Sequence, residues 1–314
     1  MKKYSNDAVR ELRKIIGMTQ AEFAEMIGVS KEYTYVPKNM SDLIETLEGF
    51  KSEWCWKEDF ILQEFIDGVE TDFGGFFNGE EWIQNSLTLY FENKPFLTGN
   101  VGPATGGAIA MQIYRPNKGY FMDILNKLTP LLKKIKYRGQ FAINSKVWEK
   151  DKKAYFLEFT PRFGYPTLPM DITMLEDNDS GFPALIKALA EKSNPNIFPT
   201  DKVGVVLELS VPPYPNDDLT HMTKGQTVDC DKKWNSYFFP YFIKWDEKKK
   251  KIALNGYSGM FCHLTCADAT LDGAVEMVYK QYIPTVRAKN LQYRVDLGKD
   301  ARKRLEQIRE WGLV

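Results

Sequence analysis

The chain has 314 residues, which is enough for two domains or for one domain with subdomains. Its 42 Lys and Arg residues balance 42 Asp and Glu residues, so no overall basic charge argues for nucleic acid as a partner. No apolar run approaches the roughly 20 residues of a membrane span, and no hydrophobic stretch of a secretory signal follows the first residues. We therefore expect a cytoplasmic protein with no membrane partner.

The first 32 residues are predicted to form a helical hairpin. Apolar residues recur at helical spacing, and Thr19 with Glu22 forms a capping box for the second helix. Residues 18–30 resemble the first helix and turn of a Cro/repressor-type helix-turn-helix. A recognition helix should follow in such a protein, but residues 33–37 are strand-like. A plain helical hairpin that leads into the next domain is therefore the favoured interpretation, and a DNA-binding regulator is the least favoured function.

The rest of the chain mixes helical and strand-like periodicity. Helices are expected at residues 41–50, 120–136, 183–192, 270–280 and 299–311. Strands are expected at residues 60–66, 73–77, 82–83, 87–91, 141–148, 154–160, 203–209 and 236–245. Residues 99–107 are rich in glycine and are expected to form a loop, either an anion-binding loop with accessible backbone N–H groups or an ordinary flexible turn.

The strand at residues 154–160 carries a carboxylate, Glu158, among apolar side chains. Residues two apart in a strand share a face, so Phe156, Glu158 and Thr160 are expected to point the same way. A carboxylate is costly to bury unless a charge pairs with it. A Mg²⁺ ion is one such partner, and Arg162, two residues beyond the strand, is another. A simpler alternative is that Glu158 lies at an edge of the sheet.

The segment Cys262-His263-Leu264-Thr265-Cys266 contains three side chains of the kinds that bind zinc. No second pair of ligands lies nearby in the sequence, so the segment is weak evidence for a metal site. The four cysteines do not indicate a disulfide framework.

Five motifs, in this order, resemble the ATP-grasp part of the phosphoribosylamine–glycine ligases, in a divergent, phage-type form. They are Leu-Gln-Glu-Phe-Ile-Asp-Gly-Val-Glu at 62–70, Gly-Pro-Ala-Thr-Gly-Gly at 102–107, Leu-Glu-Phe-Thr-Pro-Arg-Phe-Gly-Tyr-Pro-Thr at 157–167, Pro-Tyr-Pro at 213–215 and Arg-Val-Asp-Leu-Gly at 294–298. Each motif is modest, but their common order is fairly specific.

The resemblance implies an α+β fold of the ATP-grasp type with a truncated front end, an ATP-grasp core at 33–198 and a C-terminal α+β subdomain at 199–314. It also implies an ATP-dependent C–N ligase of purine biosynthesis that uses ATP and Mg²⁺. Such an enzyme activates a small carboxylate as an acyl phosphate, which the amine of a second small molecule then captures. A nucleotide-binding protein that has lost turnover is the alternative.

The resemblance also assigns residues. The adenine hinge would be Gln63, Glu64, Phe65 and Ile66, and Glu70 would hold the ribose. Glu158 and Thr160 would bind Mg²⁺, and Arg162 would face the phosphates. The substrate side would be held by Gly102, Pro103, Thr105, Gly106 and Gly107.

The sequence departs from the family at several of these motifs. Thr160 replaces an Asn, Tyr165 replaces an Asp, and Thr167 replaces a Glu. Asn100 stands near a position where an Asp is usual. By the resemblance, Lys57 would stand for the family's Lys-bearing strand. No segment fits the family's lid or its amino-terminal substrate domain, so the alternative of lost turnover stays open.

Overall fold

The computed structural model describes residues 37, 39–52, 65–176, 181–229 and 236–314. The predicted hairpin at 1–32, Lys57 and the hinge residues Gln63 and Glu64 lie outside this part of the chain. The chain divides into two compact units, residues 1–67 and residues 68–314. In the first unit, the helix α3 (Met40–Ser52) confirms the helix expected at 41–50.

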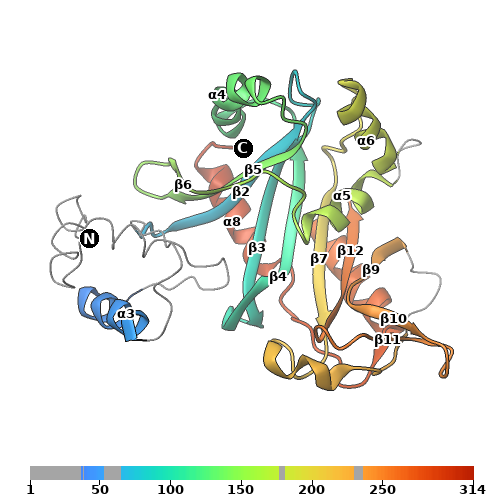
Figure 1. Cartoon of the computed structure of the whole chain (residues 1–314). Coiled ribbons are helices and arrows are strands. Elements are labelled where there is room, and N and C mark those ends of the chain that lie inside the picture. The colour runs from blue at the N-terminus through green and yellow to red at the C-terminus, as the bar shows by residue number, and fades with distance from the viewer. Residues whose placement is uncertain (1–36, 38, 53–64, 177–180, 230–235) are drawn as a thin grey trace. The chain divides into compact units, whose positions relative to one another are not determined.

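The second unit is built around an eight-stranded antiparallel sheet, with strand order β6-β5-β2-β3-β4-β7-β12-β9 (Figure 1). Its strands are β2 (Gly68–Phe77), β3 (Leu87–Leu97), β4 (Val101–Arg115), β5 (Gly139–Trp148), β6 (Ala154–Thr160), β7 (Val203–Ser210), β9 (Phe238–Pro240) and β12 (Met260–Asp268). Because β4 pairs with β7, one sheet continues across the boundary expected near residue 199.

Helices and two small sheets surround this large sheet. The helices are α4 (Tyr120–Lys134), α5 (Thr167–Leu175), α6 (Gly181–Glu191), α7 (Leu271–Glu276) and α8 (Lys299–Glu310), with short irregular turns at Asp217–Thr223, Met277–Tyr282 and Ile283–Thr285. The small sheets pair β10 (Ile243–Asp246) with β11 (Lys251–Leu254), and β8 (Val228–Asp229) with β13 (Arg287–Ala288). None of the helices in the described ranges is long and apolar enough to cross a membrane.

One face of the sheet is apolar and is covered by helices. Phe73 of β2 and Leu89 of β3 pack in one cluster with Leu125 of α4 and Leu305 of α8. The alternation of side chains along each strand directs this set to the same side, and the helical period gives α4 and α8 their apolar stripes. A second cluster joins β7 and β12 to α7 on the other half of the sheet.

The opposite face of the sheet is more polar, and α5 packs against part of it. Asp171 of α5 is fully buried, and its Oδ1 accepts hydrogen bonds from Tyr114 and, at 2.6 Å, from Gln112 of β4. Burial raises the pKa of Asp171 to about 7, although these hydrogen bonds act to lower it. A satisfied buried carboxyl group therefore fixes α5 on the sheet.

The predicted helices at 120–136, 183–192 and 299–311 and the hairpin of strands at 141–148 and 154–160 are confirmed. The single strand expected at 236–245 is wrong, because β9 and β10 belong to different sheets and Phe242 between them has a φ of 50°. The helix expected at 270–280 changes to a π-type turn at Met277.

We expect Gly74→Ala to destabilise the protein because β2 and β5 approach too closely there for a side chain. A Cβ at Gly74 would lie 2.4 Å from the carbonyl oxygen of Phe141 and 2.7 Å from the Cα of Ala142. The expected loss is roughly 1–3 kcal/mol in the free energy of unfolding, measured by urea denaturation. The control is Gly106→Ala, where a Cβ meets nothing within 4 Å; equal losses for the two variants would contradict this packing.

Candidate functional site

Acidic and amide side chains line up across the polar face of the sheet. Asp72 of β2 lies directly opposite Asn144 of β5, and Asn144 lies opposite Glu158 of β6. On its other side, Asp72 lies opposite Tyr90 of β3. Directly opposed residues of antiparallel strands point to the same face, so these four side chains form one row across four strands.

A lysine neutralises part of the charge on this face. The Nζ of Lys94 lies 3.0 Å from Glu92 Oε1 and 3.4 Å from Glu70 Oε1. Burial acts to lower the pKa of Lys94, but the carboxylates of Glu92 and Glu70 outweigh it and raise that pKa. Burial, followed by the charge of Glu92, raises the pKa of Asp72 well above its ordinary value. The face therefore carries more carboxylates than one ammonium group can neutralise.

The structure confirms that Glu158 and Thr160 share a face, since they lie opposite Asn144 and Ala142 in regular register. The expectation that Phe156 joins them is wrong. The register shifts between Asn144 and Ser145, so that Phe156 lies opposite Ser145 and on the other face. The extra residue of a β-bulge reverses the alternation of a strand. In agreement with this, the Phe156 ring contacts the Phe159 ring at 4.6 Å.

Arg162 is exposed, and its Nη1 donates to the carbonyl oxygen of Phe163 at 3.1 Å. A buried ion pair between Arg162 and Glu158 therefore does not fit the structure. The other alternative, a position at a sheet edge, does fit, because Glu158 belongs to the edge strand β6. Beyond Arg162, the chain turns at Gly164 into α5. A Cβ at Gly164 would lie 2.2 Å from Thr167 Oγ1, so a side chain there would force Thr167 to move.

The glycine-rich stretch at 102–107 is not a loop. Residues from Val101 onward form the start of β4, which pairs with β3, and the turn between the two strands contains only residues 98–100. Gly102, Pro103, Thr105 and Gly106 are exposed or half-buried. A Cβ on Gly107 would lie 3.1 Å from Pro166 Cγ and 3.4 Å from Glu92 Oε2. The motif at 102–107 and the motif at 157–167, which are distant in the sequence, thus meet beside the carboxylate of Glu92.

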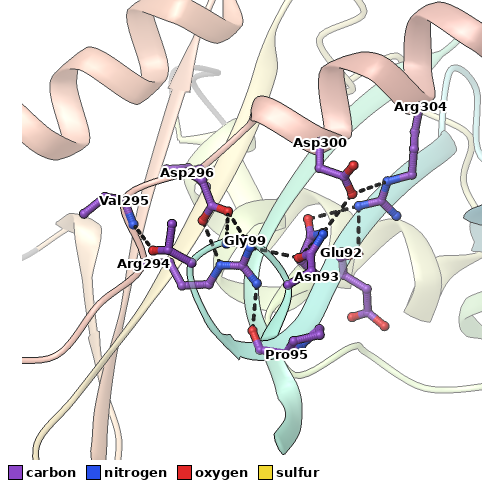
Figure 2. Close-up of polar contacts among 12 residues, drawn as sticks. Glu92, Asn93, Pro95, Gly99, Arg294, Val295, Asp296, Asp300 and Arg304 are labelled. Carbon is purple, nitrogen blue, oxygen red and sulfur yellow. Dashed lines mark hydrogen bonds and ion pairs between the residues drawn. The ribbon is translucent and has the colours of Figure 1, made fainter. Parts of the chain in front are cut away.

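A buried arginine holds the turn between β3 and β4 (Figure 2). Arg294 is 2% exposed, and its guanidinium donates to both carboxylate oxygens of Asp296, at 2.8 and 2.7 Å. It also donates to the carbonyl oxygen of Pro95 at 2.7 Å and to Asn100 Oδ1 at 2.9 Å. The N–H of Gly99 donates to Asp296 at 2.9 Å. We call the set formed by Arg294 and Asp296 the arginine clamp.

Burial acts to raise the pKa of Asp296, but the hydrogen bonds from Arg294 and from the backbone of Gly99 outweigh it and lower that pKa. The carboxylate of Asp296 therefore stays ionised near neutral pH. Asn100, near where the family has an Asp, accepts from Arg294 and from Asn93 Nδ2, the latter at 2.9 Å. The sequence at 294–298 indicated a motif of the family. It did not reveal that Arg294 of this motif forms hydrogen bonds to the end of β3 and to the turn that precedes β4.

Arg304 of α8 forms a second link to the same strands (Figure 2). Its Nη2 donates to the carbonyl oxygen of Glu92 at 2.8 Å and to Asn93 Oδ1 at 3.0 Å. Its Nε lies 3.2 Å from Asp300 Oδ2, which also accepts from Asn93. The backbone beneath Glu92 is thus fixed by charge-assisted hydrogen bonds from α8.

His263 of β12 lies opposite Glu208 of β7 on the polar face. His263 is 1% exposed, and the rings of Tyr165 and Tyr241 contact it at 5.2 and 5.0 Å. Burial lowers the pKa of His263 to about 3 and raises that of Glu208 to about 8, which a hydrogen bond from Tyr214 offsets only in part. Both groups are therefore neutral near pH 7.

Cys262 and Cys266 alternate with His263 along β12, so they point to the opposite face. Both cysteines are buried in the apolar cluster beneath the sheet, and neither forms a disulfide. The three side chains of this segment do not converge, which rules out the zinc site weighed for them.

The sequence did not single out Asp72, Glu92, Lys94 or Asn144. The available signal was the alternation of charged residues in Glu70-Thr71-Asp72 and in Glu92-Asn93-Lys94, which is typical of strands with one polar face. Of the predicted hinge, Phe65 is exposed and Ile66 is buried. Glu70 is half-buried, and its carboxylate forms an ion pair with the ammonium group of Lys94.

The sequence matches no family model and no curated protein. The structure is similar to a phosphoribosylamine–glycine ligase from Thermotoga maritima, with a TM-score of 0.68 over 92% of this chain and 72% of that one, at 18% identity. It is also similar to the biotin carboxylase domain of a 2-oxoglutarate carboxylase from Hydrogenobacter thermophilus in complex with MgADP and bicarbonate. That TM-score is 0.52 over 92% of this chain and 61% of that one, at 10% identity.

These likenesses establish the fold. The chain has the α+β ATP-grasp fold that the sequence motifs implied. Among these proteins, its architecture is similar to that of a phosphoribosylamine–glycine ligase.

We expect Arg294→Met to destabilise the protein by roughly 3 kcal/mol, because it leaves Asp296 and Asn100 without their buried partner. The matched control is Arg302→Met, because the Arg302–Asp272 pair has side chains that are 43% and 81% exposed. An exposed pair contributes at most about 1 kcal/mol. Urea denaturation measures both losses, and similar losses would contradict a special role for the clamp.

Glu208 should make the protein less stable as pH rises. Its pKa is about 8 in the folded chain, against an ordinary value of 4.5, so the folded state keeps a proton that the unfolded state releases. As pH rises from 6.5 to 8, stability should fall by up to roughly 1.4 kcal/mol per pH unit from this group. His263, whose pKa is lowered from 6.5 to about 3 on folding, adds a slope of opposite sign near pH 6.5, which cancels when the wild type is compared with a Glu208 variant.

The variant Glu208→Gln should lack this part of the slope. Glu149→Gln is the control, because Glu149 is exposed in the turn after β5. Urea denaturation at pH 6.5, 7.25 and 8 measures the slopes, and identical slopes in the wild type and Glu208→Gln would show that Glu208 is ionised when folded.

Proposed function

We propose that this protein is an ATP-dependent carboxylate–amine ligase of the phosphoribosylamine–glycine ligase type, which acts on small molecules in purine biosynthesis. The observation that carries the proposal is that one polar sheet face gathers residues from three of the five motifs. Glu70, Glu158 and Gly107 all lie on or beside this face. The ATP-grasp fold agrees with this proposal. The biotin carboxylase domain of similar fold was crystallised with MgADP and bicarbonate.

The charges on this face suit a nucleotide with its metal ion. Glu70 is the expected ribose ligand, and the backbone of residues 63–66 is the expected adenine hinge. The side chain of Lys94 is 41% exposed and provides a positive charge for phosphate oxygens between Glu70 and Glu92. Arg162 is exposed, which suits contact with a ligand.

Mg²⁺, when bound, neutralises charge on the transferring phosphoryl group. The donor set fits this ion, since Glu158 lies on a face of carboxylate and amide oxygens, and Asp72 Oδ1 there is buried without a hydrogen-bond partner. Thr160 is the second ligand that the resemblance implies. The exposed strand segment at 102–107 would hold the carboxylate and amine substrates beside these groups.

Mg·ATP should raise the melting temperature by mass action, by the equivalent of about 2.7 kcal/mol at a hundredfold excess over Kd. Glu158→Gln keeps the shape of the side chain but removes its charge, so the Mg²⁺-dependent part of the shift should disappear. Glu149→Gln is the control. The absence of any shift at millimolar Mg·ATP would overturn the proposal.

Turnover is tested by ADP release from Mg·ATP with glycine and candidate amines, each alone and together. A ligase releases ADP fastest when both substrates are present. Binding of Mg·ATP without ADP release under any of these conditions would favour the nucleotide-binding alternative. That alternative is supported by Thr160, Tyr165 and Thr167, which replace three polar residues of the family.

A further inference from the structure

A second polar cluster lies where β7 and β12 pair. Glu208 of β7 and His263 of β12 lie directly opposite each other in the register of the two strands, and side chains at such positions are neighbours. Glu208 is 6% exposed and His263 is 1% exposed. Neither residue belongs to the five motifs that carry the resemblance, so the family motifs do not account for this buried pair.

Three polar atoms of this pair are buried without a hydrogen-bond partner. They are Oε1 of Glu208 and both ring nitrogens of His263. Native proteins rarely leave buried polar atoms unsatisfied, because such atoms lose their hydration and gain no bond in return. A carboxylate oxygen and one nitrogen of a neutral imidazole both accept hydrogen bonds. The pair therefore lacks a ligand that donates hydrogen bonds.

Two tyrosine rings flank the pair. The rings of Tyr165 and Tyr241 lie 4.7 Å apart, and they meet the ring of His263 nearly edge to face, at 74° and 71°. Aromatic faces attract positive charge. Among the described residues, no lysine or arginine contributes to the pKa of Glu208, which burial and a hydrogen bond from Tyr214 determine. The cluster thus combines a buried carboxyl group with aromatic rings, and no described residue supplies it with a positive charge.

Tyr165 lies between this cluster and the strand segment expected to hold the substrates. Its ring contacts His263, and Cγ of the next residue, Pro166, would lie 3.1 Å from a Cβ on Gly107. Tyr165 is 42% exposed, so it can turn away from His263 without leaving a packed core. By the resemblance, the family has an Asp at this position. Its replacement by Tyr is what places an aromatic ring against His263.

We propose that Glu208, His263, Tyr165 and Tyr241 bind the primary ammonium group of a substrate. Tyr165 turns outward to admit the ligand, and the ammonium group donates hydrogen bonds to Glu208 Oε1 and to a ring nitrogen of His263. The tyrosine rings face its charge. In the ligase, this group belongs either to the amine substrate or to an amino acid that serves as the carboxylate substrate. That assignment to a substrate rests on the proposed function, whereas the ammonium site itself does not.

Binding of an ammonium group should release a proton from Glu208. Burial raises the pKa of Glu208 to about 8, so at pH 6.5 the ligand must displace the carboxyl proton to the buffer to form its ion pair. A primary ammonium group, like that of lysine, stays charged over this range. The affinity should therefore rise roughly tenfold between pH 6.5 and pH 8, as the fraction of ionised Glu208 rises.

The other titratable groups around Glu208 do not produce this pH dependence. They are His263, Tyr165 and Tyr241, together with the hydrogen-bond donor Tyr214. Burial lowers the pKa of His263 to about 3, raises that of Tyr165 to about 12 and raises that of Tyr241. These three groups therefore keep one protonation state between pH 6.5 and pH 8.

The test uses the two histidines of the chain, which give separate imidazole signals in nuclear magnetic resonance. The full-length protein, labelled with ¹³C at histidine, is titrated with methylammonium chloride at pH 6.5, 7.25 and 8, against sodium chloride at equal ionic strength. The signals of His263 should shift to saturation, with a Kd about tenfold lower at pH 8 than at pH 6.5. His221 is exposed and serves as the internal control. Shifts of His263 no larger than those in sodium chloride would overturn the site.

Glu208→Gln tests the carboxyl group without disturbing the fold, because Glu208 is already neutral in the folded chain at pH 6.5. Methylammonium should bind this variant about tenfold or more weakly at pH 8, with no dependence on pH, because a buried charge partner is lost. The exposed control Glu149→Gln should bind within about threefold of the wild type. Unchanged affinity in Glu208→Gln would overturn the inference.

Two further comparisons test the aromatic rings and the charge of the ligand. Tyr165→Leu should bind methylammonium roughly two- to fivefold more weakly than Tyr165→Phe, which keeps the ring. Equal affinities of the two variants would overturn the role of the ring. Acetamide is a neutral donor of hydrogen bonds and should leave the His263 signals unchanged. Saturable shifts with acetamide but not with methylammonium would overturn the inference in favour of a neutral ligand.

The site and the proposed function fail in different ways. In the ADP-release assay, Glu208→Gln should raise the KM of the substrate that carries the ammonium group, either the amine or glycine, and leave the other KM unchanged. Methylammonium binding through Glu208 in a chain that Mg·ATP does not stabilise would support the site and count against the function. Stabilisation by Mg·ATP without methylammonium binding would support the function and overturn the site.

Discussion

The guanidinium of Arg294 is the group on which the arrangement of the candidate site depends. A buried charge is very costly unless it is paired and hydrogen-bonded, and here Asp296, Asn100 and the carbonyl oxygen of Pro95 satisfy it. These partners belong to the C-terminal segment and to the ends of β3 and β4. The clamp therefore sets where the glycine-rich start of β4 lies. Arg304 extends the same constraint to the backbone of Glu92 and to Asn93.

The polar face of the sheet is set by the alternation of side chains along the strands and by their register. A sheet in a globular protein usually turns its polar face to water, yet Tyr90, Gln112 and Asn144 on this face are buried. The carboxylates of Glu70 and Glu92 cluster there around the ammonium group of Lys94. Such a surface is unfavourable for a chain that binds nothing, because like charges repel and buried acceptors lose their hydration. It is favourable for a chain that binds a cation and an anionic ligand together.

Several errors of the sequence interpretation have identifiable causes. Glycines and a proline at 102–107 suggested a loop, but pairing with β3 extends the strand through them, since a missing side chain does not prevent backbone hydrogen bonding. Phe156 was assigned to the wrong face because strict alternation has no place for a bulge. The Cys-His-Cys segment suggested a metal, but in a strand its members face opposite sides. In each case strand pairing overrode a local pattern.

The sequence by itself determined the features that depend on local periodicity. The helical stripes at 120–136 and 299–311, the hairpin of β5 and β6, and the common face of Glu158 and Thr160 follow from periods of 3.6 and 2.0 residues. The order of five motifs was also sufficient to indicate the ATP-grasp fold. Only the tertiary structure placed Arg294 beside Pro95, 199 residues away along the chain. It alone placed Asp72, Asn144 and Glu158 in one row and His263 opposite Glu208. These neighbours depend on strand order and register, which long-range packing selects and which no local pattern encodes.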